Sequence, residues 1–368
     1  MKDDLLYALA LYQTANVGTI TALNLLEYFG DYKSIFSANR TKLEKVRGIG
    51  QKIATEVFES RTSALEKAES ELKFIEHNQI QVLFYDDEQY PQRLKNCFDA
   101  PFILFAKGEY DFNKERMLAI VGTRHATEYG KTLTQQFVEA LSPYDISIVS
   151  GLALGIDSIA HQSAVKYKMQ NIAVLGHGLD MIYPATNKKL AEKIRENGAL
   201  LTDFFSETIP NKQNFPRRNR IVAGMVDAVL VVESAKKGGA LITAQIANSY
   251  NREVFCVPGN IGNPYSEGCN YFIKTNQAQL VTEAKDIIEF MNWDNANKLQ
   301  NTIPKQLFVT LNDEESLIYE IIKTHKKIHI DDLLGKTPYN LSNLSNILLQ
   351  LELQDVIKPI PGKFYTLQ

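Results

Sequence analysis

The stretch Ala119-Ile-Val-Gly-Thr-Arg124 is an apolar run that stops at a glycine, and the helical pattern Lys131–Leu141 follows it. A buried strand that turns through glycine into a helix leaves backbone N–H groups pointing outward, where the helix dipole favours an anion. Arg124 adds a planar donor that suits phosphate oxygens. This stretch therefore predicts a strand-turn-helix unit with an anion site at the end of its strand.

Four more apolar runs of strand length follow, with helical stretches between them. The expected strands, each with the helix after it, are Ile148–Ser150 with Ile156–Lys166, Ala173–Leu175 with Lys188–Glu196, Asp227–Glu233 with a helix through Tyr250, and finally Val254–Val257. Strands that alternate with helices imply βαβ units, a parallel sheet and right-handed crossovers. Ligands on such sheets bind outside the carboxyl ends of the strands, so the glycine turns there should meet at one edge. We expect an α/β fold with an extended, Rossmann-like, mostly parallel sheet.

Two nucleotide motifs are not met by these turns. Gly176-His-Gly178 lacks the third glycine of the Gly-x-Gly-x-x-Gly fingerprint, and no Gly-x-x-x-x-Gly-Lys-Ser/Thr loop occurs. Hydride transfer and hydrolysis of nucleoside triphosphates are therefore disfavoured.

Composition limits the remaining classes of protein. The chain has 368 residues, 45% of them apolar, which is enough for two or three domains. No apolar run is long enough to span a membrane, and the start Met-Lys-Asp-Asp opposes a signal peptide, so we expect a cytoplasmic protein with no membrane partner. Cys97, Cys256 and Cys269 are dispersed packing residues, and we expect neither a metal nor a cofactor. Asp157 and His161 share one helix face, which favours a surface hydrogen bond over a metal site.

A basic stretch interrupts an otherwise slightly acidic chain. The formal net charge is -3, yet from Lys212 to Lys237 six basic residues stand against two acidic ones. Such a stripe confines polyanion binding to one groove, although a solvated helix face gives the same pattern. Phe215, beside the arginines, offers a stacking face of the kind single-strand binders use, or else anchors the loop as a core residue.

Further domains are expected on both sides of the sheet. Residues 1–65 should form a small helical domain, because Leu43–Ile53 resembles a helix-hairpin-helix (SAM-like) motif whose Gly-Ile-Gly turn contacts DNA or is purely structural. Residues 66–291 should form the Rossmann-like domain, with added strands at Gln81–Tyr85 and Phe102–Ala106.

The remainder of the chain is expected to form a linker and a small third domain. Residues 292–309 are polar and rich in asparagine, as in linkers. Residues 310–368 have the element order of a winged helix. Its expected recognition helix, 339–352, contains no lysine or arginine, so we favour a protein contact or a folded remnant over DNA binding.

Five stretches of the sequence occur in one characteristic order: Val121-Gly-Thr-Arg124, Ser150–Asp157, Tyr183-Pro184, Phe215–Ile221 and Gly238–Ala244. Over roughly residues 75–290 they resemble the DNA-processing protein A family (DprA, also called Smf). Longer members of that family also have a helical first domain and a winged-helix tail. The chain departs mildly from the family at Thr123, where many members have serine.

The resemblance implies a single-stranded DNA-binding protein of natural transformation (competence). Members shield incoming strands, help to load the RecA recombinase, form homodimers and have no known catalysis. Their DNA lies in a pocket of the Rossmann sheet. Adding the neighbouring basic residues to the positions that match this pocket, we expect these DNA- and phosphate-binding residues: Gly122, Thr123, Arg124, Ser150, Gly151, Lys212, Phe215, Arg217, Arg218, Asn219, Arg220, Lys236, Lys237, Gly238 and Gly239.

Two other functions remain open from the residues alone. A related group of Rossmann-like enzymes hydrolyses nucleoside monophosphates with a Pro-Gly-Gly-x-Gly-Thr-x-x-Glu motif. Here Lys237–Gln245 occupies that place, and Gln245 replaces the catalytic glutamate, so the general acid/base step has no agent and we expect no enzyme. A sensor of small nucleotides would use the same turns without the arginine cluster.

Overall fold

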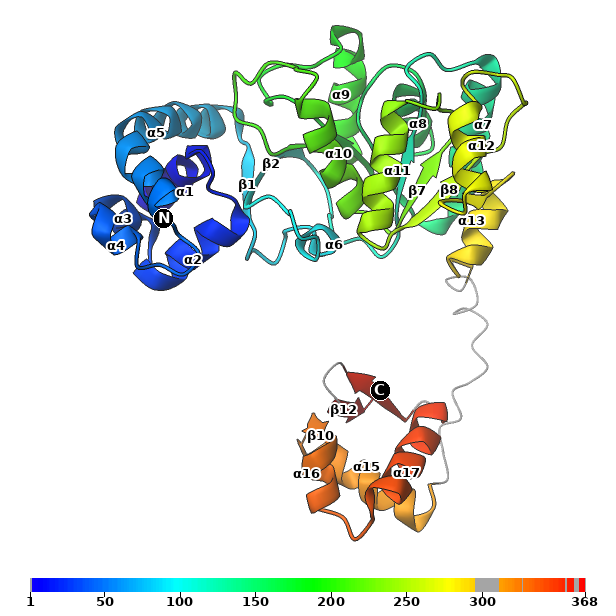
Figure 1. Ribbon diagram of the computed structural model, residues 1–368. Coiled ribbons are helices and arrows are strands. Elements are labelled where there is room, and N and C mark those ends of the chain that lie inside the picture. Colours follow the sequence, from blue (N-terminus) through cyan, green and yellow to red (C-terminus); the bar gives the residue numbers. More distant parts are fainter. Residues whose placement is uncertain (1, 295–310, 326, 355, 361–363, 368) are drawn as a thin grey trace. The chain divides into compact units, whose positions relative to one another are not determined.

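The computed structural model describes residues 2–294, 311–325, 327–354, 356–360 and 364–367. The chain divides into two compact units, Met1–Ala296 and Asn297–Gln368 (Figure 1). The linker expected at 292–309 lies outside the described residues from 295 onward.

The first unit begins with five helices, which are α1 (Lys2–Gln13), α2 (Thr19–Phe29), α3 (Tyr32–Ser37), α4 (Arg40–Leu43) and α5 (Gln51–Asn78). They share an apolar core in which Leu9, Leu25 and Ile35 are fully buried. The turn before α5 contains Gly48, whose positive φ of 78° favours glycine. Because α5 continues to Asn78, the domain boundary expected at residue 65 falls within a single helix.

A sheet of nine strands follows in the same unit. The strands are β1 (Gln81–Phe84), β2 (Ile103–Gly108), β3 (Met117–Val121), β4 (Ser147–Ser150), β5 (Asn171–Val174), β6 (Gly198–Thr202), β7 (Ala228–Val231), β8 (Glu253–Cys256) and β9 (Gln279–Leu280). Their spatial order is β1-β2-β6-β5-β4-β3-β7-β8-β9. The pairs β1–β2 and β2–β6 are antiparallel and all others are parallel, which confirms the mostly parallel, Rossmann-like α/β fold.

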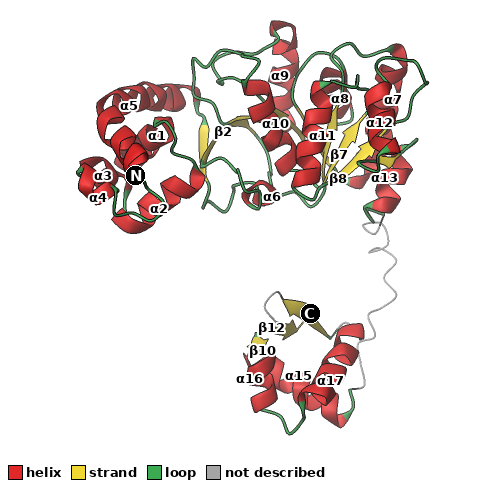
Figure 2. Cartoon of the chain, viewed as in Figure 1, coloured by secondary structure: helices red, strands yellow, loops and turns green. Residues whose placement is uncertain are grey.

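Helices cover both faces of this sheet (Figure 2). Leu118 and Ile120 of β3 point to one face, where they pack with α7 (Glu128–Leu141), α8 (Ile156–Lys166) and α13 (Ala284–Phe290). Ala119 and Val121 point to the other, as the two-residue period of a strand requires. That second face is covered by α10 (Asn214–Gly224), α11 (Gly239–Ser249), α12 (Glu267–Lys274) and the short helix α6 (Gln92–Lys95). The short helix α9 (Lys188–Ile194) packs in a separate apolar cluster.

Two local features differ from the sequence expectations. β6 was not among the expected strands, because Gly198-Ala-Leu-Leu-Thr202 is made largely of good helix formers directly after a helix. Pairing with β2 and β5 on either side overrides that preference. The basic stretch is also more regular than expected, since Phe215–Arg220 lies inside the helix α10.

The second unit has its own small core. It contains α15 (Asp313–His325), β10 (Ile328–His329), α16 (Ile330–Gly335), α17 (Leu341–Leu353), β11 (Ile357–Ile360) and β12 (Phe364–Leu367), and its antiparallel sheet has the order β10-β12-β11. Ile318, Leu333 and Leu344 are fully buried between the helices. No described helix of either unit combines the length and the apolar character that crossing a membrane requires.

A buried carboxylate fixes the turn between β3 and α7. Glu233 follows β7 and is 2% exposed. Its carboxylate accepts hydrogen bonds from the backbone N–H of Thr127 at 2.9 Å and from the Thr127 hydroxyl at 2.5 Å. Its backbone carbonyl accepts from the N–H of Thr123 at 2.8 Å. Glu233 therefore holds both ends of the turn that contains Arg124.

We expect Glu233→Ala to lower the free energy of unfolding by about 2 kcal/mol, because two partly buried donors of Thr127 lose their acceptor. Urea unfolding followed by circular dichroism measures this. Glu233→Gln keeps one acceptor oxygen and should cost less. Glu253→Ala, at an exposed site, should change stability by less than about 0.5 kcal/mol. A similarly small loss for Glu233→Ala would contradict the assigned role.

Candidate nucleic-acid interface

A pocket of about 480 Å³ opens at the carboxyl ends of β3, β4 and β7, with α10 as one wall. The chain continues from β3 to β4, β5 and β6 on one side of the sheet and returns to β7, β8 and β9 on the other. The pocket therefore lies at the switch point of the strand order, where doubly wound sheets bind ligands. We call it the sheet-edge pocket. Ten of the residues predicted from sequence line it: Gly122, Thr123, Arg124, Gly151, Lys212, Phe215, Arg218, Asn219, Gly238 and Gly239.

Glycine is required where the turns of this pocket approach one another. A Cβ at Gly155, whose φ is +78°, would lie 2.2 Å from the carbonyl oxygen of Thr123. A Cβ at Gly151 would lie 2.2 Å from a guanidinium nitrogen of Arg218. The turn after β4 thus packs at backbone distance from the turn after β3, and the Arg218 side chain of α10 lies against Gly151, which brings distant parts of the sequence to one site.

Arg124 and Phe215 meet at the mouth of the pocket. The Arg124 guanidinium carbon lies 4.8 Å from the centroid of the Phe215 ring, and the Tyr183 ring is 6.3 Å from it. Phe215 is half-buried, whereas Arg124 and Lys212 are exposed. Of the two interpretations left open by the sequence, this position fits a wall of the pocket better than a core anchor. The pocket mouth therefore combines an aromatic ring with two exposed cations.

Arg218 lines the same pocket but is only 5% exposed. Its guanidinium donates to the carbonyl oxygen of Gly151 at 2.5 Å and to that of Val174, and its Nε donates to the Asn219 side chain at 3.2 Å. Burial lowers the pKa of Arg218 to about 10, against the opposing effect of the Asp157 carboxylate. Arg218 thus holds α10 against the ends of β4 and β5, with Nη1 donating to both backbone carbonyl oxygens.

Asp157 and His161, expected as a surface pair, are both buried because α8 packs that face on the sheet. The Asp157 carboxylate accepts from the N–H groups of Gly151 and Ala153 at 3.2 and 3.4 Å. Burial raises the pKa of Asp157, with Arg218 opposing. Nδ1 of His161 lies 2.5 Å from Oδ1 of Asn171, and burial lowers the pKa of His161 to about 4. Among the described residues no group of side chains could hold a metal ion.

Five predicted residues lie outside the pocket. The Ser150 hydroxyl is fully buried and donates to the carbonyl oxygen of Ile120 at 2.6 Å, so it is not available to a ligand. Arg217 and Arg220 extend from the opposite side of α10, into a different cavity. Lys236 and Lys237 are exposed outside the lining, with Lys236 Nζ 5.7 Å from the Tyr271 ring. Side chains at neighbouring positions of one helix or turn point in different directions. The number of basic residues between Lys212 and Lys237 could not reveal this.

The lining residues that the sequence analysis missed include two with ring side chains, His125 and Tyr265. The rings of His125 and Tyr265 lie 6.4 Å apart on the pocket wall. His125 directly follows the predicted turn and could have been included on that ground. Tyr265 lies in the loop after β8. This loop reaches the site because the backbone carbonyl oxygen of Tyr265 accepts a hydrogen bond from the N–H of Ser234 at 2.7 Å. No local pattern marks such a loop.

The sequence of the chain is similar to those of known proteins. Residues 81–292 match the sequence model of the family described as DNA recombination-mediator protein A. The chain is 30% identical to Protein Smf of Synechocystis over 98% of both chains, and 37% identical to Protein Smf of Escherichia coli over 82% of this chain and 81% of that one.

Two solved structures are also similar. DNA processing protein A from Streptococcus pneumoniae has 31% identity and a TM-score of 0.63, covering 77% of this chain and 97% of that one. DNA processing protein A from Helicobacter pylori, whose structure describes a single-stranded DNA binding mode, has 30% identity and a TM-score of 0.54 over 59% of this chain and 98% of that one.

We expect Arg218→Ala to lower the free energy of unfolding by about 3 kcal/mol, because the buried carbonyl oxygens of Gly151 and Val174 lose their donor. Chemical unfolding monitored by circular dichroism gives the value. Lys212→Ala removes the same charge from an exposed site and should change stability by less than about 0.5 kcal/mol. Equal stabilities of the two variants would show that Arg218 is a surface contact residue instead.

Proposed function

The chain belongs to the DNA recombination-mediator protein A family, and from this membership we propose that it binds single-stranded DNA in the sheet-edge pocket. One observation carries the proposal. The exposed Arg124 lies against the half-buried ring of Phe215 at a pocket mouth that also contains Lys212. Cations beside an aromatic ring match the two needs of an unpaired strand, which are phosphate neutralisation and base stacking.

The similar proteins support the same substrate. The relatives from Bacillus subtilis and Streptococcus pneumoniae are named DNA processing protein DprA, and the Helicobacter pylori structure concerns single-stranded DNA. By extension we propose a cytoplasmic, homodimeric protein of natural transformation that protects incoming strands and helps to load RecA.

The outer parts of the chain are proposed to assist this role. We propose that residues 1–65 form the helix-hairpin-helix-like domain, 66–291 the DNA-binding domain and 310–368 a winged-helix domain after the linker 292–309. The order α15, β10, α16, α17, β11, β12 supports the last assignment. Because α17 carries no lysine or arginine, a protein contact suits it better than DNA.

We further propose that binding occurs without catalysis. The hydrolase reading needs a carboxylate where this chain has Gln245, which is exposed on α11 and does not line the pocket. The acidic side chain that does line it is Asp157, whose carboxylate already accepts two backbone N–H groups. A general acid/base must reach the substrate, whereas the Asp157 side chain is buried and its carboxylate is engaged by the backbone.

A sensor of small nucleotides is the competing function, and length dependence separates the two. We expect a single strand of about 30 nucleotides to bind far more tightly than a mononucleotide, since it occupies more contacts along the charged track. We also expect it to bind more tightly than a duplex of the same sequence. Fluorescence anisotropy with purified protein measures all three. Comparable affinities for the strand and the mononucleotide would favour the sensor.

Salt dependence tests the phosphate contacts. Arg124→Ala and Lys212→Ala should each weaken binding of the strand and reduce the slope of log K against log salt by about 0.7, the value for one lost single-strand contact. Titrations at several salt concentrations give these slopes. Lys193→Ala is a charge-matched control, because Lys193 is exposed in the last turn of α9, before β6 and thus at the opposite edge of the sheet. Unchanged slopes in both pocket variants would reject the pocket.

Phe215→Ala removes an uncharged side chain from the pocket and is the control for the salt slope. It should weaken binding by about 1–3 kcal/mol through lost stacking while the salt slope stays at the wild-type value, since stacking releases no ions. A large change of slope would mean that the neighbouring cations had moved.

A further inference from the structure

A second cavity lies on the other side of α10. It has a volume of about 720 Å³, and we call it the lateral cleft. Its walls are the segment Gln13–Thr21 between α1 and α2, the segment Phe98–Phe102, the residues Asp203–Phe205 after β6, and one side of α10. The cleft therefore forms only where the N-terminal helices meet the sheet.

The helix α10 separates the two cavities. Lys212 and Gln213 precede it, and Phe215, Arg218 and Asn219 line the sheet-edge pocket. The lateral cleft is lined by Asn214, Arg217 and Arg220, which are spaced three residues apart along α10. Because Asn214 and Arg217 each stand one position before Phe215 and Arg218, they point in a different direction from the helix. The first turn of α10, from Asn214 to Arg217, thus borders both cavities.

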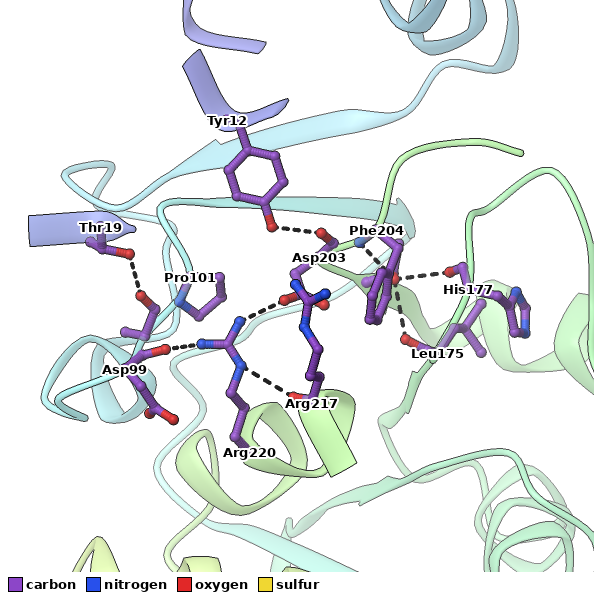
Figure 3. Close-up of polar contacts among 12 residues, drawn as sticks. Tyr12, Thr19, Asp99, Pro101, Leu175, His177, Asp203, Phe204, Arg217 and Arg220 are labelled. Carbon is purple, nitrogen blue, oxygen red and sulfur yellow. Dashed lines mark hydrogen bonds and ion pairs between the residues drawn. The ribbon is translucent and has the colours of Figure 1, made fainter. Parts of the chain in front are cut away.

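Hydrogen bonds and one ion pair between protein groups hold the wall of the lateral cleft together. Arg220 forms an ion pair with Asp203 at 2.6 Å and donates to the carbonyl oxygen of Asp99 (Figure 3). The Tyr12 hydroxyl donates to the backbone carbonyl of Asp203 at 2.6 Å, and the Thr19 hydroxyl to that of Ala100 at 2.5 Å. These bonds attach α1 and α2 to the sheet, and they use the charge of Arg220 within the protein.

Arg217 differs from its neighbour. Its guanidinium lies 5.0 Å from the centroid of the Phe204 ring, is exposed, and forms no ion pair within the part of the chain that the structure describes. Figure 3 shows it beside Phe204. A guanidinium plane of this kind is a surface on which unpaired bases stack. At the rim of the same cleft the Phe98 ring is 75% exposed.

The wall of the cleft contains a buried acceptor without a partner among the described residues. Asp203 is 2% exposed, and while its Oδ2 accepts from Arg220, its Oδ1 is buried without a hydrogen-bond partner among the described residues. A second carboxylate, that of Asp99, accepts from the Tyr250 hydroxyl. Two carboxylates and one unpaired cation suit a phosphate poorly. A neutral ring fits this environment better.

We propose that the lateral cleft receives an unstacked base of the same DNA strand, which stacks on the Arg217 guanidinium next to Phe98. The inference rests on the proposed function and extends it. The sheet-edge pocket holds phosphates with cations and backbone amides, whereas the lateral cleft holds a base in a nearly neutral site. The N-terminal helices are then part of the DNA-binding surface.

The test compares strands of two lengths with the full-length protein. A short oligothymidylate of about 5 nucleotides fills the sheet-edge pocket, and one of about 30 nucleotides reaches both cavities. Arg217→Ala and Phe98→Ala should each weaken binding of the long strand about fivefold or more, with the short strand unaffected. Lys193→Ala is the control for loss of one charge at an exposed site.

Arg217→Lys separates stacking from phosphate binding. Lysine keeps the charge but loses the planar group, so we expect the same loss of long-strand affinity as with alanine and a wild-type salt slope. Full rescue of affinity by lysine would overturn the base assignment. Phe98→Ala changes an exposed side chain, so it tests the cleft even if the Arg217 variants are unstable.

The two proposals fail in different ways. A wild-type protein that binds neither strand refutes single-stranded DNA binding itself. If the wild-type protein binds both strands, and Arg217→Ala and Phe98→Ala keep its long-strand affinity, the lateral cleft is not a base site and the sheet-edge pocket is untouched.

Discussion

The site depends on one buried cation. Arg218 donates to the carbonyl oxygens of Gly151 and Val174, at the ends of β4 and β5, from within α10. A charge with so little exposure is tolerated because strand-end carbonyls and the Asp157 carboxylate compensate it. The bonds fix both the distance and the rotation of α10 relative to the sheet. Since α10 is the wall shared by the two cavities, its rotation decides which side chains each cavity receives.

Basic residues in this protein serve two separate purposes. Arg218 and Arg220 are engaged by protein acceptors, and they build the walls. Arg124, Lys212 and Arg217 are exposed and make no ion pair within the described residues. A cation that has already exchanged its water for protein oxygens gains little from a phosphate, whereas an exposed one still releases counterions on binding. The number of arginines in a basic stretch therefore overstates the number of possible phosphate contacts.

Local signals made part of this structure predictable. The parallel strands and their glycine turns could be predicted because apolar runs and glycines act over a few residues, as at Gly122 and Gly151. β6 could not, since pairing with β2, about ninety residues earlier, overrides its helical composition. The different directions of Arg217 and Arg218 depend on helix phase, which the expectation of a loop and a helix in this stretch did not fix. The contribution of Tyr12 and Thr19 depends on contacts across the whole unit.

The different charge of the two cavities has a thermodynamic consequence. Binding energy from phosphates in the sheet-edge pocket comes from counterion release and therefore falls as salt rises. Stacking in a nearly neutral cleft displaces few ions, so its contribution remains when the electrostatic part is screened. The two contributions can act on one strand because α10 lines both cavities. A strand long enough to cover both would then stay bound at salt concentrations that release a shorter one, without any contact that reads its sequence of bases.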